Sequence, residues 1–338
     1  MNDTPNSKPR HSFRKGFFAA VVFLAIAAAA YFYGFQTLDM VRAASFTPSS
    51  QLSGVEERIE LTDTGTRIFR ATSPAIEDSD QFNSDCQSTE RTTAILGCYY
   101  RDQIYLYNVQ NEELDGALET TAAHELLHAA YSRLNFFEKQ RVDALINAQY
   151  EKVKDDETIK ELMSYYSEAE PGEETNELHS ILGTTIASLD SELEEYYARY
   201  FEDRAVVVAL SQKYTQTFAS LEAQAEEYKT KIASEEAALE TAISDYKSDL
   251  SQLNSDIQSF NQRAQSGDFT SLAAFQSSRS TLAARVSALN QQQAELNSRI
   301  EAYNDMIAEY NALAVRANQL YQSINGVTAP SEISDDNG

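Results

Sequence analysis

A heptad repeat in the last third of the chain limits its possible folds more than any other sequence feature. Apolar residues recur at alternating steps of four and three over 282–324, and a shorter run with the same spacing covers 239–260. This 3.5-residue period keeps an apolar seam along one side of a helix, which is typical of a coiled coil. Between the runs, SGDFTS contains a glycine and possible N-cap residues, so a helix should end there. We predict an antiparallel coiled-coil hairpin over 213–325 with its turn near 266–271; a parallel dimeric coiled coil is the alternative.

Acidic residues outnumber basic residues in the chain as a whole. The sequence has 27 Lys and Arg against 52 Asp and Glu, a net charge of −25. A surface of this sign repels a polyanion, so we expect no binding to nucleic acid. Hydrophobic residues make up 42% of the 338 residues, which is enough to bury a core. The length is consistent with about two domains.

An uncharged apolar stretch of 19 residues, Phe17 to Phe35, lies near the N-terminus. As a helix it would span about 28 Å, close to the hydrocarbon thickness of a bilayer. Basic residues precede it, so the positive-inside rule predicts a cytoplasmic tail at 1–16, a transmembrane helix at 17–35 and an extracytoplasmic remainder. We expect a bacterial cell surface, because no Asn-x-Ser/Thr sequon follows the stretch. A cleaved signal peptide and a buried core helix are the alternatives. A linker at 36–54 should follow.

Cys86 and Cys98 are the only cysteines of the chain. Both fall on the predicted extracytoplasmic side, where an oxidising environment favours disulfides. We therefore predict that they pair. Two unpaired buried thiols are the alternative, and the absence of a Cys-x-x-Cys spacing argues against a cysteine zinc site.

Residues 55–212 should form one α+β domain that is mostly α. A short helix near 55–60 and a strand near Arg67–Ala71 are followed by a polar loop at 77–91. Residues 94–109 are rich in β-branched and aromatic types and predict an antiparallel hairpin with its turn at Arg101-Asp102. Helical patterns then follow, at 112–134, 136–154, 157–168, 173–184 and 190–214. The tail at 326–338 is expected to be disordered.

The segment TTAAHELLHAAY (120–131) contains the residues with the clearest chemistry. His124, Glu125 and His128 form a His-Glu-x-x-His motif. Residues four apart lie on the same face of a helix, about 5–6 Å apart, so both imidazoles can reach one zinc ion. Glu125 can then take a proton from water at the open metal position. Surface or core histidines on an ordinary helix are the alternative.

This motif, in a predicted helix that follows an apolar hairpin, resembles the zincin metallopeptidases. The resemblance covers about 95–200 and is specific only at the motif itself. It implies one zinc ion and an edge strand that binds extended substrate by β-augmentation. Here Ile95–Tyr100 or Gln103–Val109 could be that strand. Tyr131 and Leu134 stand where the metzincin subgroup has glycine and histidine, which favours the gluzincin subgroup.

Gluzincins take their third zinc ligand from a later helix. The Asn-Glu pair that ends in Glu177 resembles the start of that helix, so the resemblance implies Glu177 as the ligand. Ile181 stands where the subgroup has a further acid. His179 could be the third ligand instead, a donor to the transition-state oxyanion, or a packed histidine. Glu173 and Glu174 are further candidates, and an acid within 191–204 could orient a ligand histidine.

Together these features predict a membrane-anchored, extracytoplasmic zinc metallopeptidase that cleaves a peptide or protein substrate. Zinc would polarise the substrate carbonyl and lower the pKa of its bound water, and Glu125 would act as general base. The alternative is a surface scaffold or adhesion-like coiled-coil protein whose zincin-like domain is inactive or structural. In either case the coiled coil could bind a protein partner along its length.

Overall fold

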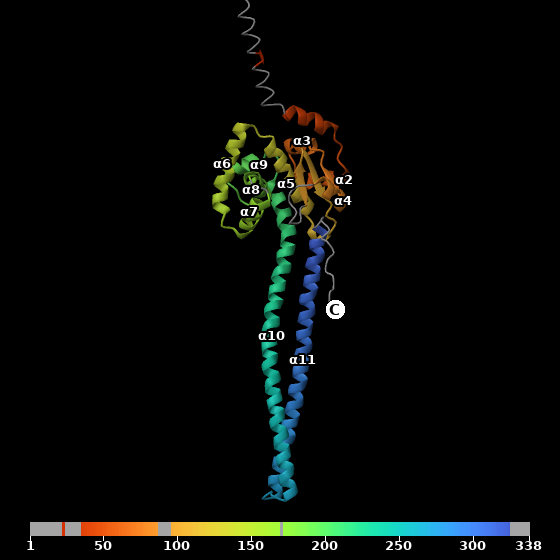
Figure 1. Cartoon of the computed structure of the whole chain (residues 1–338), viewed down its shortest axis with the longest axis vertical. Helices are drawn as coiled ribbons and strands as arrows, with labels where there is room; N and C mark the ends of the chain where they lie inside the picture. Colours follow the sequence, from red (N-terminus) through yellow and green to blue (C-terminus); the bar gives the residue numbers. More distant parts are fainter. Residues whose placement is uncertain (1–21, 24–34, 87–95, 170–171, 325–338) are drawn as a thin grey trace, which may run out of the picture. The chain divides into compact units, whose positions relative to one another are not determined.

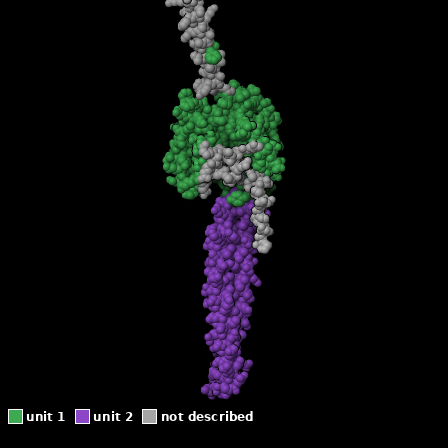
Figure 2. Space-filling model, viewed as in Figure 1, with its two compact units in different colours: residues 1–217, 320–338 green, residues 218–319 purple. Residues whose placement is uncertain are grey.

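The computed structural model describes residues 22–23, 35–86, 96–169 and 172–324 (Figure 1). The chain divides into two compact units: unit 1 comprises 1–217 with 320–338, and unit 2 comprises 218–319 (Figure 2). The predicted tails at 1–16 and 326–338 lie outside the described residues.

The predicted membrane segment, 17–35, is described only at Val22, Phe23 and Phe35. Within the described part of the chain, no helix combines the length and the apolar character that a membrane span needs. The transmembrane assignment therefore stays a prediction.

The linker predicted at 36–54 is helical over most of its length. Residues 35–45 are helical, and helix α2 (Ser50–Arg58) already begins inside the predicted linker. The Ser49 side chain caps α2 by accepting a hydrogen bond from the amide of Leu52. The Ser/Pro-rich stretch thus supplies a helix cap as well as a connection.

A strand was expected near Arg67–Ala71, but these residues belong to helix α3 (Asp63–Ala71). The Thr62 hydroxyl accepts from the amide of Gly65 at 3.0 Å and so caps the helix. The apolar side chains that suggest a strand, such as Ile68 and Phe69, are buried in the core on one face of this helix. The local propensity for a strand is therefore overridden by capping and by core burial.

The sheet has three strands in the order β1-β3-β2: β1 (Ala75–Glu77), β2 (Gly97–Tyr100) and β3 (Gln103–Tyr107). β2 and β3 form the predicted hairpin, with Arg101 and Asp102 at its turn. Both turn residues have positive φ, 51° and 64°, as a two-residue turn of type I′ requires. The prediction of a purely antiparallel element is wrong, because β1 pairs with β3 in parallel. Helix α4 (Ser79–Asp85) occupies part of the predicted loop.

Helices make up the rest of unit 1. In chain order they are the 3-10 helix η1 (Glu112–Leu114), α5 (Ala117–Ser132), α6 (Phe136–Val153), α7 (Glu157–Ala169), α8 (Glu174–Thr185) and α9 (Ser191–Tyr197). Asn135 and Glu138 form a capping box that starts α6. The mainly helical α+β class is confirmed.

The single helix predicted at 190–214 is interrupted between α9 and the long helix α10 (Arg204–Ser266). At this break the backbone pairs with a distant segment: Leu61 and Phe201 form an antiparallel bridge, and the amide of Glu202 donates to the carbonyl of Glu60 at 2.7 Å. Backbone groups that pair with another segment cannot continue the helix, which explains the interruption.

In unit 2, α10 and α11 (Leu272–Ile324) lie side by side and run antiparallel (Figure 1). Arg299 on α11 pairs with Glu235 on α10 at 2.8 Å, and Arg285 pairs with Asp256. Later residues of α11 thus meet earlier residues of α10, as the predicted hairpin requires. The helices are separated at 267–271, within the predicted turn.

Candidate metal centre

Helix α5 carries the His-Glu-x-x-His motif through the centre of unit 1. Its alanine and leucine side chains from 122 to 130 are buried in the main hydrophobic core. Strands β2 and β3 pack against α5, and so does α8. The motif is therefore held on a helix whose position is set by packing from several elements.

Three side chains converge between α5 and α8. The Nε2 atom of His128 lies 3.3 Å from Oε1 of Glu177, and Nε2 of His124 lies 3.5 Å from Oε2 of the same carboxylate. One ligand atom from each of the three residues lies within 4.8 Å of the other two. His128 and Glu177 are buried, and His124 is partly exposed. The structure thus brings the three predicted ligands together.

These distances fit a divalent metal. Zinc with donors at about 2.0–2.1 Å in a tetrahedron separates neighbouring donor atoms by about 3.3–3.4 Å. The two measured carboxylate–imidazole separations, 3.3 and 3.5 Å, are close to that value. Two histidines and one glutamate also leave one tetrahedral position open, as catalytic zinc sites do. The group could hold a metal ion, and its donors suit zinc.

A close approach between α5 and α8 sets these distances. Gly183 on α8 packs so tightly that a Cβ atom there would lie 2.3 Å from Cδ1 of Leu127 and 2.9 Å from Cε1 of Tyr197. Only glycine fits without displacing one of these side chains. Glu177 is about two helical turns before Gly183, so this contact holds its carboxylate near the histidines.

No significant match to this chain is found among protein-family models, curated proteins or solved structures. Its chemistry must therefore be inferred from the residues of the site and their surroundings.

Glu125 lies beside the first residue of strand β2. A Cβ atom at Gly97 would lie 3.2 Å from Oε1 of Glu125 and 2.5 Å from Cγ2 of Thr121. Glycine at this position lets the strand lie directly against the face of α5 that carries the carboxylate. Glu125 is itself buried. The strand and the proposed general base are thus neighbours, a relationship that the sequence alone did not reveal.

The order of the sheet decides between the two candidate substrate strands. β3 is the central strand and uses both of its edges, one for β1 and one for β2. β2 is an outer strand, and among the described residues no strand pairs with its other side. Gln103–Val109 is therefore excluded as an edge strand, while the described part of Ile95–Tyr100 is an outer strand of the sheet.

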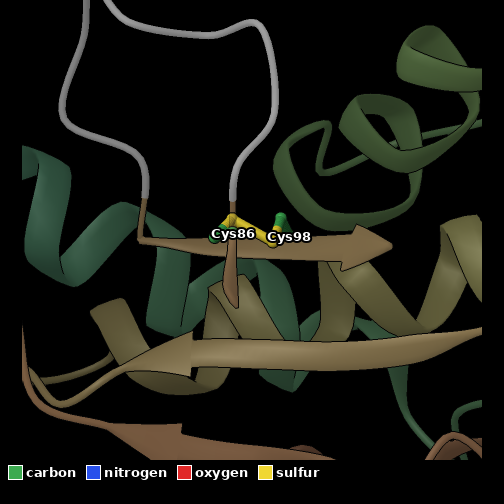
Figure 3. Close-up of a disulfide and its surroundings, with 2 residues drawn as sticks. All are labelled: Cys86 and Cys98. Carbon is green, nitrogen blue, oxygen red and sulfur yellow. A yellow bond between two sulfur atoms is a disulfide. The ribbon is translucent and has the colours of Figure 1, made fainter. Parts of the chain in front are cut away.

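The predicted disulfide is confirmed, and it braces this strand. Cys86 follows α4, and Cys98 is the second residue of β2, next to Gly97 (Figure 3). On β3, Tyr105 is the partner of Cys98 in the strand register. The crosslink therefore holds β2 from the side of α4 while β3 holds it by hydrogen bonds.

His179 is fully buried rather than placed at a surface. Its Nε2 atom lies 2.9 Å from the hydroxyl of Tyr196, and its ring packs against Tyr131 with centroids 5.2 Å apart. Burial, followed by the nearby His128 and His124, lowers the pKa of His179 well below its usual value. This environment is that of a neutral packed histidine, one of the three alternatives, and His179 is not among the clustered ligand atoms.

Tyrosines in and just after α9 connect this histidine to the rest of the core. Tyr197 donates to the backbone carbonyl of His179 at 2.6 Å, and Tyr200 donates to the hydroxyl of Tyr196 at 3.3 Å. These contacts hold α8 against the segment that begins with α9. The abundance of tyrosine in 191–204 was visible in the sequence, but its role in positioning α8 was not.

The other acidic candidates lie elsewhere. Glu173 and Glu174 are not members of the ligand group. Within 191–204, Glu194 forms an ion pair with the buried Arg204, whose guanidinium also donates to the carbonyl of Ile186 at 2.7 Å. Glu194 therefore stabilises the end of α8 and the start of α10. No contact assigns to it the orientation of a ligand histidine.

Proposed function

We propose that this chain is a zinc-dependent metallopeptidase. The observation that carries the proposal is the convergence of His124, His128 and Glu177 on one point, with Glu125 beside an outer strand of the sheet. Two histidines, one glutamate and a neighbouring carboxylate are the groups that hydrolytic zinc chemistry uses.

Metal binding, proton transfer and substrate alignment fall to different parts of the site. His124, His128 and Glu177 would hold the ion, which supplies a Lewis acid for a carbonyl and lowers the pKa of water. Glu125 accepts the proton of the attacking water and then delivers it to the leaving amine. The N–H and C=O groups of β2 align an extended peptide by adding it to the sheet.

The proposed location is outside a cell membrane, with 17–35 as the anchor and 1–16 on the cytoplasmic side. The uncharged stretch and its basic flank support this orientation. The Cys86–Cys98 disulfide also supports it, because such bonds persist in oxidising compartments. Unit 2 would provide a site for a protein partner.

The decisive test uses the full chain in detergent, loaded with zinc and incubated with a pool of diverse peptides. Glu125→Gln should abolish cleavage and retain zinc, because it removes the base and leaves all three ligands. His124→Ala should lose both. Glu173→Gln, which changes an acid outside the ligand group, should retain both and serves as the matched control.

Two results would contradict the proposal. Cleavage that continues in Glu125→Gln would remove the proposed base. Bound zinc without cleavage of any peptide would favour the other function, a surface scaffold or adhesion-like protein in which the metal has a structural role.

A further inference from the structure

Exposed apolar side chains of unit 1 are concentrated in two short segments. The set, here called the apolar patch, has exposures of 45–69% and consists of Phe35, Leu38, Met40 and Val41 in the helix at 35–45 and of Phe136 and Phe137 at the start of α6. Among the other described residues of unit 1, large apolar side chains are exposed only at Val22, Phe23, Tyr100 and Tyr321. A concentration of this kind marks a surface that meets an apolar partner.

A buried ion network joins these segments. Arg133, at the end of α5, donates to both carboxylate oxygens of Asp39, at 2.8 and 3.1 Å, and to Asp102 at 2.8 Å. Arg42 also pairs with Asp102. The side chains of Arg133 and Asp39 are only 6% and 4% exposed. Asp39 is the one buried residue of the helix at 35–45, so this network is its principal attachment to the domain.

Chain geometry keeps the two segments close. Phe136 and Phe137 follow Arg133 by three and four residues, so their Cα atoms lie within about 11–15 Å of that of Arg133. Asp39 lies inside the other segment and contacts Arg133 directly. Both segments of the patch therefore lie close to the same buried ion network.

The start of α6 holds its two phenylalanines outward. The Asn135 side chain accepts from the amides of Phe137 and Glu138, and the Glu138 carboxylate accepts from the amide of Asn135. The rings of Phe136 and Phe137 stand 5.5 Å apart, edge to face. A firm helix cap thus presents a pair of aromatic rings to the surroundings instead of turning them into the core.

We propose that the apolar patch lies in the interfacial layer of the lipid bilayer, an inference that rests on the membrane anchor of the proposed function. The uncharged stretch ends at Phe35, the first residue of the patch. Asp39 follows after one helical turn, a rise of about 6 Å. The headgroup layer beside the hydrocarbon core is about 5–8 Å thick, so the docked segment of α6 is within reach of it. Exposed aromatic rings suit that layer, because it is apolar on one side and wet on the other.

The docking has a consequence for the candidate metal centre. His128 and His124 precede Arg133 by five and nine residues on α5, a rise of about 8 and 14 Å. An enzyme docked in this way therefore works close to the bilayer surface, on membrane-proximal segments of its substrates.

The chain contains no tryptophan, so a single introduced tryptophan reports its own surroundings. We would place Phe137→Trp in the full chain, reconstitute it in phosphatidylcholine vesicles, and compare brominated with ordinary lipid. The matched control is Ala148→Trp, an exposed position on the same helix, about 17 Å further along its axis. Bromine on the acyl chains should reduce the emission of Trp at 137 by about twofold, because the ring lies at the headgroup–acyl boundary, and should have much less effect at 148. Phe136→Trp provides a second probe of the same surface.

The outcomes separate the two proposals. Alkaline carbonate that extracts the chain from the vesicles overturns both the anchor and the docked patch. A chain that resists extraction, with emission at 137 that is unquenched or is quenched no more than at 148, overturns the docked patch alone. Emission at 137 that is shielded from water but not quenched indicates a protein partner and also overturns it.

Discussion

Helix α5 and the hairpin of unit 2 show two ways in which this chain uses helices. Of the 16 residues of α5, 13 are buried, and they include Glu125 and His128. In the 218–319 segment only Leu221, Leu239, Leu253 and Leu289 are buried to the same degree. A two-stranded coiled coil encloses a seam, whereas a helix in a globular core is enclosed on all sides. Only the second arrangement can keep carboxylates and imidazoles together away from water.

The two regions also differ in how far their ion pairs are buried. Unit 1 buries the Arg133–Asp39 pair almost completely, while the cross-helix pairs of unit 2, such as Arg299–Glu235, remain about one-third exposed. Exposed pairs contribute little to stability, about 0–1 kcal/mol. Breaking a buried pair costs several times more, because one charge is left without a partner. The Arg133–Asp39 pair therefore constrains the packing of unit 1, whereas the exposed pairs add little to the apolar seam of unit 2.

The largest expected difference between the units is their response to metal. His128→Ala removes a ligand, so zinc affinity should fall by more than about a hundredfold, beyond the 10–100-fold typical of outer contacts. Zinc should increase hydrogen-exchange protection of α5 and α8 in the natural chain and not in this variant, because only the folded site binds the ion. Protection in unit 2 should not change in either protein. Equal zinc content in both proteins, measured by mass spectrometry, would show that the ion binds elsewhere.

Truncation of a buried leucine should give the next largest difference between the two units. Leu127 is fully buried in α5, and Leu253 is nearly so in the seam of α10. Leu127→Ala should cost about 3–5 kcal/mol, because an enclosed cavity cannot collapse, and Leu253→Ala about 2–3 kcal/mol, because the paired helices can close on the gap. Hydrogen exchange measured in each region gives the two opening free energies. Equal losses would mean that the two environments are equally rigid.

A smaller effect is expected where α5 meets α8. Gly183→Ala inserts a methyl group against Leu127 and Tyr197 and should destabilise unit 1 by about 1–3 kcal/mol. It should also weaken zinc binding, because α8 carries Glu177. The matched control is Gly54→Ala in α2, where a Cβ would meet no atom within 4 Å. That change should stabilise by about 0.4–1 kcal/mol. Thermal unfolding and zinc titration of both variants provide the measurement, and unaltered zinc affinity in Gly183→Ala would contradict the role given to this contact.

The smallest expected effect is a pH dependence of the unfolding free energy that comes from one carboxyl group in the sheet. Burial, and then the charge of Asp85, raise the pKa of Glu77 from 4.5 to about 7. Between these values the folded chain holds a proton that the unfolded chain has released, so stability falls as the pH rises from about 4.5 to 7. Glu77→Gln removes this titration and should flatten the slope of unfolding free energy against pH over that range. An unchanged slope would assign the dependence to other groups.

Local sequence patterns were sufficient to predict the elements whose structure depends on residues close together in the chain. The heptads over 239–260 and 282–324, the hairpin turn at Arg101-Asp102 and the cap at Asn135 each depend on residues a few positions apart. The His-Glu-x-x-His motif belongs to the same class, because the pitch of a helix alone places its two imidazoles on one face.

Predictions failed where distant segments meet. The helix at 190–214 is broken because its backbone pairs with residues 60–62, more than 130 positions away. The segment at 67–71 is helical because Thr62 caps the helix and one face of that helix packs in the core. β1 pairs in parallel with β3 through a crossover connection, which no local pattern predicts.

The sequence by itself determined that His124, Glu125 and His128 would share one helical turn, and that the helices of the last third would each carry an apolar seam. These are consequences of the helical repeat, which needs no tertiary contact. Only the tertiary structure decided that Glu177 faces those histidines, that β2 rather than β3 is an outer strand beside Glu125, and that His179 is packed in the core. Each of those outcomes depends on the packing of α5 against other elements, because Gly97 and Gly183 set how closely β2 and α8 can approach it.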